Sequence, residues 1–124
     1  MNHPVERIYA AMNEDRLEDL DALFAPGYVD HDEGYTGVDA LKAQLKTFRA
    51  AFPDLHITIE DTVEQGDRVA TRTEVTGIHT GELMGLPPTG RAIRVSAVDI
   101  SRFESGRAVE RWGGLNTYSL MVQL

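Results

Sequence analysis

The side chains best suited to chemistry in this chain are carboxylates and imidazoles, because its 124 residues include 20 Asp or Glu, four His and no Cys. Without Cys there is no thiol nucleophile, thiolate metal site or disulfide. One acid stands out by its place in a period-two pattern. Asp99 shares one face of the segment 91–103 with residues that are mostly apolar: Ile93, Val95, Ala97, Ser101 and Phe103. The pattern therefore predicts that Asp99 is buried.

Two interpretations of Asp99 stay open. In the first, a buried carboxylate in an apolar setting acts as a general acid or base. In the second, it is structural and pairs with an Arg or with backbone donors. The alternation predicts that Arg94, Arg102 and Arg111 point to the opposite face of their strands, which disfavours the simplest local ion pairs.

Two histidines are further candidates. His31 lies between Asp30 and Asp32 and could orient a substrate carbonyl or act as a base near neutral pH, or it could be an ordinary loop residue. His79 ends a predicted strand, where it could contact a ligand or simply terminate the strand.

Three larger side chains could contact a substrate. Trp112 and Tyr118 could line an aromatic pocket or belong to the core. Met84 lies in the apolar segment 82–88, which could cover the mouth of a cavity or form a dimer contact.

These side chains must be positioned by helices that come first and strands that follow. Apolar residues recur at helical spacing in segments 4–12, 17–24 and 38–51. The period then changes to two in segments 55–64, 68–79, 91–103 and 107–118, with turns at 65–67 and 104–106 and a long loop at 80–90. Helices followed by strands predict a single α+β domain, residues 1–124. About four antiparallel strands, curved around about three helices, would enclose a cone-shaped cavity.

Composition excludes several classes of function. The net charge of −8 disfavours nucleic-acid binding. No apolar run approaches the roughly 20 residues that span a bilayer, and the N-terminal residues lack a signal-peptide pattern, so a cytoplasmic protein without membrane contact is expected. Neither a helical metal-ligand spacing nor a glycine-rich phosphate loop is present, so no metal and no cofactor are expected.

Three segments in this order resemble the SnoaL-like polyketide cyclase (ester cyclase) family of the NTF2-like superfamily: 28–31 (YVDH), 77–90 (GIHTGELMGLPPTG) and 99–112 (DISRFESGRAVERW). The resemblance implies a cone-shaped fold and cofactor-free acid/base chemistry on a hydrophobic, carbonyl-bearing small molecule. In such a reaction a carboxylate moves a proton during an intramolecular aldol ring closure. Many relatives carry an Asp where this chain has Asn116, which can donate a hydrogen bond to an oxyanion but cannot exchange a proton.

The resemblance leaves Asp99 as the predicted proton-transfer group, with His31 as a second catalytic candidate and Asn116 as the oxyanion donor. His79, Trp112, Tyr118 and Met84 are the predicted substrate contacts. It also implies a homodimer through the outer sheet face, where Val98, Ile100, Val109 and Leu115 are expected. Two alternatives remain: a non-catalytic ligand-binding domain of the same fold, and a hydrolase of the epoxide type, which needs two carboxylates and an Arg around one water.

Overall fold

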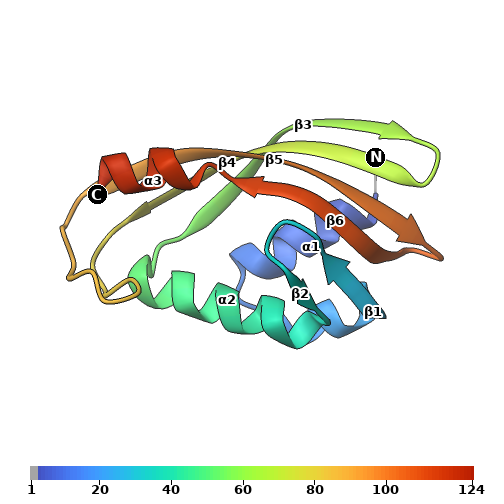
Figure 1. The fold of residues 1–124 in the computed structure, drawn as a ribbon, viewed down its shortest axis with the longest axis horizontal. Coiled ribbons are helices and arrows are strands. Elements are labelled where there is room, and N and C mark those ends of the chain that lie inside the picture. The colour runs from blue at the N-terminus through green and yellow to red at the C-terminus, as the bar shows by residue number, and fades with distance from the viewer. Residues whose placement is uncertain (1–2) are drawn as a thin grey trace.

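The computed structural model describes residues 3–124, and its main feature is one long, curved sheet of six strands (Figure 1). The strands are β1 (Phe24–Asp30), β2 (Tyr35–Thr36), β3 (His56–Gln65), β4 (Arg68–Ile78), β5 (Ala92–Glu104) and β6 (Arg107–Leu115). Their order across the sheet is β2-β1-β6-β5-β4-β3. Neighbouring strands are antiparallel except β1 and β6, which run parallel.

Helices cover the concave side of this sheet. The segments α1 (Pro4–Asn13), the 3₁₀ helix η1 (Leu17–Ala22) and α2 (Val38–Ala51) lie there together, while α3 (Thr117–Gln123) lies at one end of the sheet (Figure 1). Helix α1 begins where Pro4 sets the first-turn backbone and His3 Nδ1 accepts a hydrogen bond from the Val5 amide at 3.0 Å. Helix α2 ends at the residue before Phe52, and Pro53 follows.

The predicted α+β class, with a curved sheet packed against helices, is confirmed, but the predicted number of elements is wrong. The four predicted strands correspond to β3–β6, and the described residues add β1 and β2, so the sheet has six strands and is not wholly antiparallel. A fourth helix, α3, also replaces the predicted end of the last strand. No helix among residues 3–124 is long and apolar enough to cross a membrane.

Two apolar clusters occupy the space between the helices and the sheet. The first joins α1 to strands β1 and β4 through residues such as Val5, Ile8, Phe24 and Val69. The second joins the end of α2 to β5 and α3 through residues such as Phe52, Val95 and Leu120. Members of both clusters, such as Ile8 and Leu55, line the cavity described below.

An irregularity in β6 decides which of its side chains face inward. Phe103 pairs with Ala108, but the next pair is Arg102 with Glu110, so Val109 is an extra residue in the ladder. A bulge of this kind reverses the in–out alternation beyond it. As a result Arg111, opposite the buried Ser101, lies on the concave face, and Trp112, opposite the exposed Ile100, lies on the convex face.

Candidate functional site

Polar side chains gather on the concave face where the three central strands run side by side. Thr71 of β4 lies opposite Asp99 of β5, and the neighbouring Ser101 lies opposite Arg111 of β6. Thr71, Asp99 and Ser101 are all buried. The prediction that Asp99 points inward is therefore confirmed.

Asp99 is held by two cavity residues through one of its oxygens. Its Oδ2 accepts hydrogen bonds from the Tyr9 hydroxyl at 2.9 Å and from Arg111 Nη2 at 3.0 Å. Among the described residues no hydrogen bond to Oδ1 is formed, although the residue is only 2 % exposed. One carboxylate oxygen is thus fixed and the other is free to accept a proton.

Arg111 bridges two buried carboxylates. Its Nη1 donates to Asp30 Oδ2 at 2.9 Å while Nη2 donates to Asp99. Asp30 is fully buried, and its Oδ1 accepts a hydrogen bond from the Glu33 amide at 2.9 Å. Burial lowers the pKa of Arg111, but the charges of Asp99 and Asp30 and the hydroxyl of Tyr9 outweigh it and leave the pKa raised. The guanidinium is therefore permanently charged.

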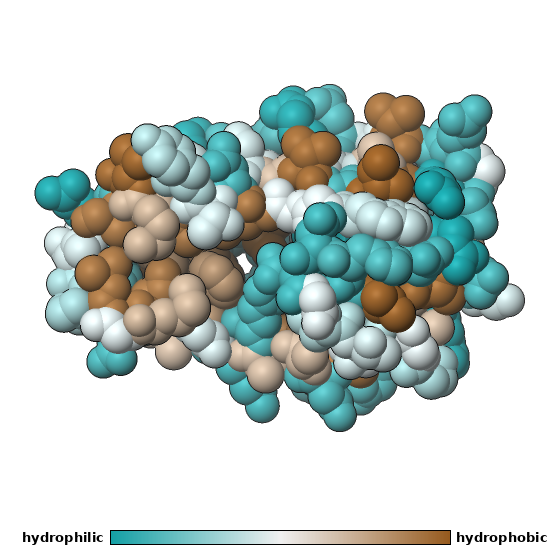
Figure 2. All heavy atoms as spheres, in the orientation of Figure 1, coloured by the Kyte–Doolittle hydropathy of each residue, from teal (hydrophilic) through white to brown (hydrophobic). Residues whose placement is uncertain are grey.

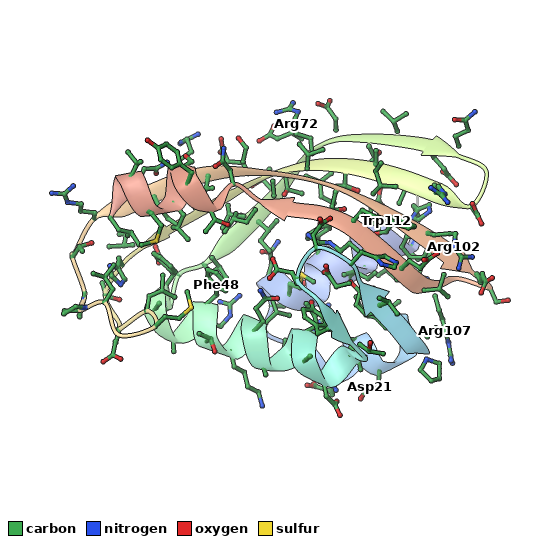
Figure 3. All side chains as sticks on the ribbon, in the orientation of Figure 1. Asp21, Phe48, Arg72, Arg102, Arg107 and Trp112 are labelled. Carbon is green, nitrogen blue, oxygen red and sulfur yellow. The ribbon has the colours of Figure 1, made fainter. Side chains whose placement is uncertain are left out.

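A cavity of about 150 Å³ opens beside this cluster. Most of its wall is apolar and comes from α1, α2 and the concave face: Val5, Ile8, Met12, Leu41, Leu45, Phe48, Leu55, Ile57, Val75, Ala97 and Leu115. The hydroxyl-bearing part of the wall consists of Tyr9, Tyr28, Tyr35, Thr73 and Ser101, next to Arg111. Phe48 projects from α2 toward the sheet (Figure 3). In the view of Figure 2 a hollow opens near the centre of the molecule, with mostly apolar residues on one side and hydrophilic residues on the other.

The cavity tyrosines are neutral hydrogen-bonding groups. Burial is the largest cause that raises the pKa of Tyr9, and the negative charge of Asp99 adds to it. Burial likewise raises the pKa of Tyr28 and Tyr35 well above the ordinary value for a phenol. A carbonyl-bearing molecule in the cavity would meet phenolic donors rather than phenolates.

Asp99 does not itself line the cavity, whereas Ala97 and Ser101 on either side of it do. Tyr9 and Arg111, which bind its Oδ2, also line the cavity. The carboxylate thus lies directly behind the cavity wall. The arrangement also satisfies the structural interpretation of Asp99, because an Arg pairs with it.

Two of the predicted site residues lie on the convex face instead of in the cavity. Trp112 follows the bulge, so its predicted inward placement is wrong. His31 stacks on the Trp112 ring at 5.0 Å between centroids, and its Nε2 lies 2.9 Å from Glu110 Oε1. The guanidinium carbon of Arg68 also lies over the Trp112 ring, 5.0 Å from its centroid. Neither His31 nor Trp112 lines the cavity.

The other predicted residues also lie away from the cavity wall. Asn116 caps α3, where its Oδ1 accepts a hydrogen bond from the Ser119 amide at 3.0 Å. His79 is fully buried, packs on Phe52, and accepts the Thr89 amide on Nδ1 at 3.1 Å. Tyr118 and Met84 are 81 % and 78 % exposed. The strand predicted for 107–118 ends at Leu115, which is why Asn116 caps α3 and Tyr118 lies within it.

Sequence reasoning missed Asp30, Arg111 and Tyr9. Asp30 could have been found, because Tyr28 and Asp30 alternate with Val29 and His31, so that one pair faces inward. Arg111 was hidden by the bulge. Tyr9 was recognised only as part of an apolar helix face. Within residues 3–124 no group of three or more His, Asp or Glu side chains is arranged to hold a metal ion.

A curved sheet that closes over helices around one apolar cavity with a polar end defines the class of small α+β cone domains. Comparison with known proteins narrows this class. The family model for SnoaL-like polyketide cyclases matches residues 3–124. The chain belongs to that family.

Individual relatives agree with this assignment. The aklanonic acid methyl ester cyclase DnrD of Streptomyces peucetius is 26 % identical over 109 residues, which cover 83 % of this chain and 75 % of DnrD. The structure of IdmH from Streptomyces antibioticus is 34 % identical and superposes with a TM-score of 0.83 over 98 % of both chains. TsrD from Streptomyces laurentii is 27 % identical, with a TM-score of 0.87 over 97 % of this chain and 90 % of TsrD.

Proposed function

We propose that this protein is a cofactor-free acid/base enzyme that closes a ring in a hydrophobic, carbonyl-bearing small molecule by an intramolecular aldol reaction. The observation that carries the proposal is the state of Asp99. It is a buried carboxylate with one oxygen held by Tyr9 and Arg111 and the other free, directly behind the wall of an apolar cavity. Family membership supports the same type of reaction.

The proposed reaction balances without a co-reactant. Asp99 removes a proton from a carbon next to carbonyl groups and leaves an enolate. The enolate carbon forms a bond to a second carbonyl carbon of the same molecule, whose oxygen becomes an alkoxide. The alkoxide takes the proton back from the Asp99 carboxylic acid, so the product is an isomer of the substrate. The cavity contributes by holding the two reacting carbons together.

The proton has two possible routes to Asp99. It can pass directly to the free Oδ1, or it can pass through the Tyr9 hydroxyl, which donates to Oδ2. In the direct route, Tyr9→Phe retains most of the activity because Arg111 still holds the carboxylate. In the relayed route, Tyr9→Phe loses as much activity as Asp99→Asn.

The test compares Asp99→Asn with the exposed control Asp61→Asn, using aklanonic acid methyl ester, the substrate named for the relative DnrD. Asp99→Asn is expected to lower kcat by about 10²- to 10⁴-fold, the usual contribution of a general acid or base. Asp61→Asn should leave it unchanged. Exchange of the acidic C–H with deuterated water, followed by NMR, reads the proton-transfer step even where ring closure of this compound is slow. Full activity of Asp99→Asn would refute the proposed base.

A hydrolase of the epoxide type is a second candidate because of one specific observation. Two buried carboxylates, Asp30 and Asp99, flank Arg111 with contacts of 2.9 and 3.0 Å. Such a group could polarise one water for attack on an epoxide. Hydrolysis would introduce oxygen from isotopically labelled water into the product, whereas the aldol reaction introduces none.

The remaining alternative is a ligand-binding domain without catalysis. In that case calorimetry would measure the same affinity for a carbonyl-bearing ligand in the original protein and in Asp99→Asn, and neither would convert it. Activity that is lost while affinity is retained supports the enzyme.

We further propose a homodimer through the convex face of the sheet. Its strand register aligns an apolar row, the outer stripe, made of Val63, Ala70, Ile100 and Trp112. Val63 and Ile100 are 68 % and 41 % exposed, which favours a partner over solvent. Leu115, predicted for this face, lines the cavity instead. Light scattering should give the mass of a dimer, and Ile100→Asp should halve that mass. Thr58→Asp, on the same face but away from the outer stripe, should leave the dimer mass unchanged.

Cellular location and the absence of a cofactor belong to the same proposal. The aldol reaction needs only proton transfer and hydrogen bonding, so no prosthetic group has a role in it. A chain without Cys gains nothing from an oxidising compartment, which fits a cytoplasmic enzyme.

A further inference from the structure

One tyrosine of the cavity wall, Tyr28, has a hydroxyl that bonds no described residue. Tyr28 is 1 % exposed and lines the cavity, yet its hydroxyl forms no hydrogen bond within residues 3–124. Of the other cavity tyrosines, Tyr9 donates to Asp99 and Tyr35 donates to Gln44 at 3.5 Å. Among the described residues, the enclosed side-chain atoms without a partner are Thr71 Oγ1 and His79 Nε2, so the Tyr28 hydroxyl keeps access to the cavity. It can therefore bond a group that arrives from outside.

The ring of Tyr28 is held in one orientation. It packs edge-to-face on Phe24 with 4.7 Å between centroids, and Tyr35 lies against it at 6.4 Å. Its backbone carbonyl accepts the Gly37 amide at 2.7 Å, which fixes the strand. A donor that is fixed before the ligand binds needs little reorganisation when charge develops on the ligand.

Tyr28 also lies at the polar end of the cavity rather than along its apolar walls. It lies two residues before Asp30 on the same face of β1, and Asp30 pairs with Arg111 of β6 and accepts a hydrogen bond from its Nη1 at 2.9 Å. Arg111 is already occupied by both carboxylates. The group that could otherwise hold a developing negative charge is therefore neutralised, and Tyr28 is the described cavity tyrosine whose hydroxyl is left unbonded.

We propose that Tyr28 donates a hydrogen bond to the substrate carbonyl oxygen that becomes the enolate oxygen when Asp99 removes the proton. The donor keeps its own proton throughout, and the hydrogen bond strengthens as charge moves onto the oxygen. This assigns to Tyr28 the oxyanion role that the sequence predicted for Asn116, which caps α3 instead. The inference rests on the proposed function and restricts the substrate to compounds whose acidic C–H lies next to such a carbonyl.

The hydroxyls of Ser101 and Thr73 are the competing donors, since both residues line the cavity and neither hydroxyl is bonded to a described residue. A serine or threonine hydroxyl rotates freely, and an alkyl alcohol is a weaker donor than a phenol. Ser101→Ala is therefore the variant that separates the two assignments.

The test needs no natural substrate. In Asp99→Asn, which imitates the protonated base, the binding of para-nitrophenol imitates the enolate, and para-nitrotoluene serves as its neutral isostere. The visible absorbance of the phenolate reports the ionisation of the bound probe, and calorimetry gives both affinities. Three second substitutions are compared in this background: Tyr28→Phe, Ser101→Ala, and Tyr118→Phe as the control for the same chemical change at an exposed site.

Tyr28→Phe is expected to weaken phenolate binding by about 10- to 100-fold, the loss of one hydrogen bond to a charged group, while binding of the neutral probe changes little. It should also raise the pKa of the bound nitrophenol. Tyr118→Phe should change neither. Equal phenolate affinity in Tyr28→Phe, a larger loss in Ser101→Ala, or failure of both probes to bind would each overturn the assignment. Activity that persists in Asp99→Asn would instead refute the proposed base and leave this measurement intact.

Discussion

Arg111→Met is the substitution that most directly tests the cluster at the polar end of the cavity. Met keeps much of the length of the Arg side chain but removes the charge and all five donors. The two partners, Asp30 and Asp99, have side chains that are 0 % and 1 % exposed, so neither can turn to solvent when Arg111 is lost. The variant protein must then either bury unpaired carboxylates or take up protons.

The structure gives the expected size of this effect. Removing one partner from a buried ion pair costs about 3–5 kcal/mol because a charge is left uncompensated. A domain of this length loses about 4 °C of Tm per kcal/mol, so a decrease of about 12–20 °C is expected. The control is Arg102→Met on the convex face. The two Arg side chains are similarly exposed, 23 % and 24 %, but the acids around Arg102 are far more exposed, as the 26 % of Glu110 shows.

Urea unfolding followed by circular dichroism measures both variants against the original protein at neutral pH. The deficit of Arg102→Met should be much smaller than that of Arg111→Met at neutral pH. Equal losses in the two variants would refute the reasoning, since they would mean that burial of the acids contributes nothing to the importance of Arg111.

Three further predictions concern pH and backbone geometry. Burial raises the pKa of three cavity tyrosines: Tyr9, Tyr28 and Tyr35. Their contribution to stability is complete below pH of about 10 and is lost as the pH rises further, so ultraviolet absorbance should show them ionising only together with unfolding. Hydrogen bonds from Arg102 and, as the smaller cause, from His31 lower the pKa of Glu110. The stabilising effect of the Glu110 carboxylate is therefore present above pH of about 4 and lost below it. In Glu110→Gln, the free energy of unfolding measured with urea should depend less on pH in that acidic range. Gly113→Ala should destabilise strongly in thermal unfolding, because its Cβ would lie 2.3 Å from a β5 carbonyl oxygen at φ +97°, whereas Gly27→Ala, with no atom within 4 Å, should not.

The alternation of apolar residues was a reliable guide along the strands that pair regularly. In β5 every second residue from Ile93 to Phe103 is buried, as the period-two pattern predicted. The antiparallel register with β4 is unbroken over eleven pairs, so nothing shifts the phase along the way. Asp99 could therefore be placed from sequence alone, because its orientation depends only on local alternation.

The same reasoning fails in β6 because a bulge depends on the partner strand. Val109 is extra only in relation to Arg102 and Phe103, and no residue type in the segment 107–112 marks it. A single extra residue exchanges the two faces, which moved Trp112 out of the predicted pocket and Arg111 into it. Its predicted place on the opposite face therefore disfavoured an ion pair between Arg111 and Asp99, although this pair is formed.

The remaining errors lie where short segments depend on tertiary contacts. Phe24 was grouped with a helix because leucines precede it, but it begins β1, which pairs with the distant β6. The change from strand to helix after Leu115 is stabilised by Gln123, whose side chain bonds both the amide and the carbonyl of Arg94 at 2.7 and 2.9 Å. These contacts join residues that are far apart in sequence, so local periodicity could not indicate them.

The parallel pairing of β1 with β6 explains why the two most recognisable segments of the sequence serve two different sites. Val29 is paired with Glu110 and Asp30 with Arg111, so segments 28–31 and 110–112 lie side by side and alternate in phase. Their inward residues lie at the polar end of the cavity, where Tyr28 and Arg111 line the wall and the buried Asp30 bonds Arg111. Their outward residues form the stacked and ion-paired group on the convex face: His31, Glu110 and Trp112. A role assigned to one residue of either segment therefore says nothing about its neighbour. Substitutions at His31 or Trp112 are expected to affect the convex face, and with it the proposed dimer, before they affect the proposed reaction.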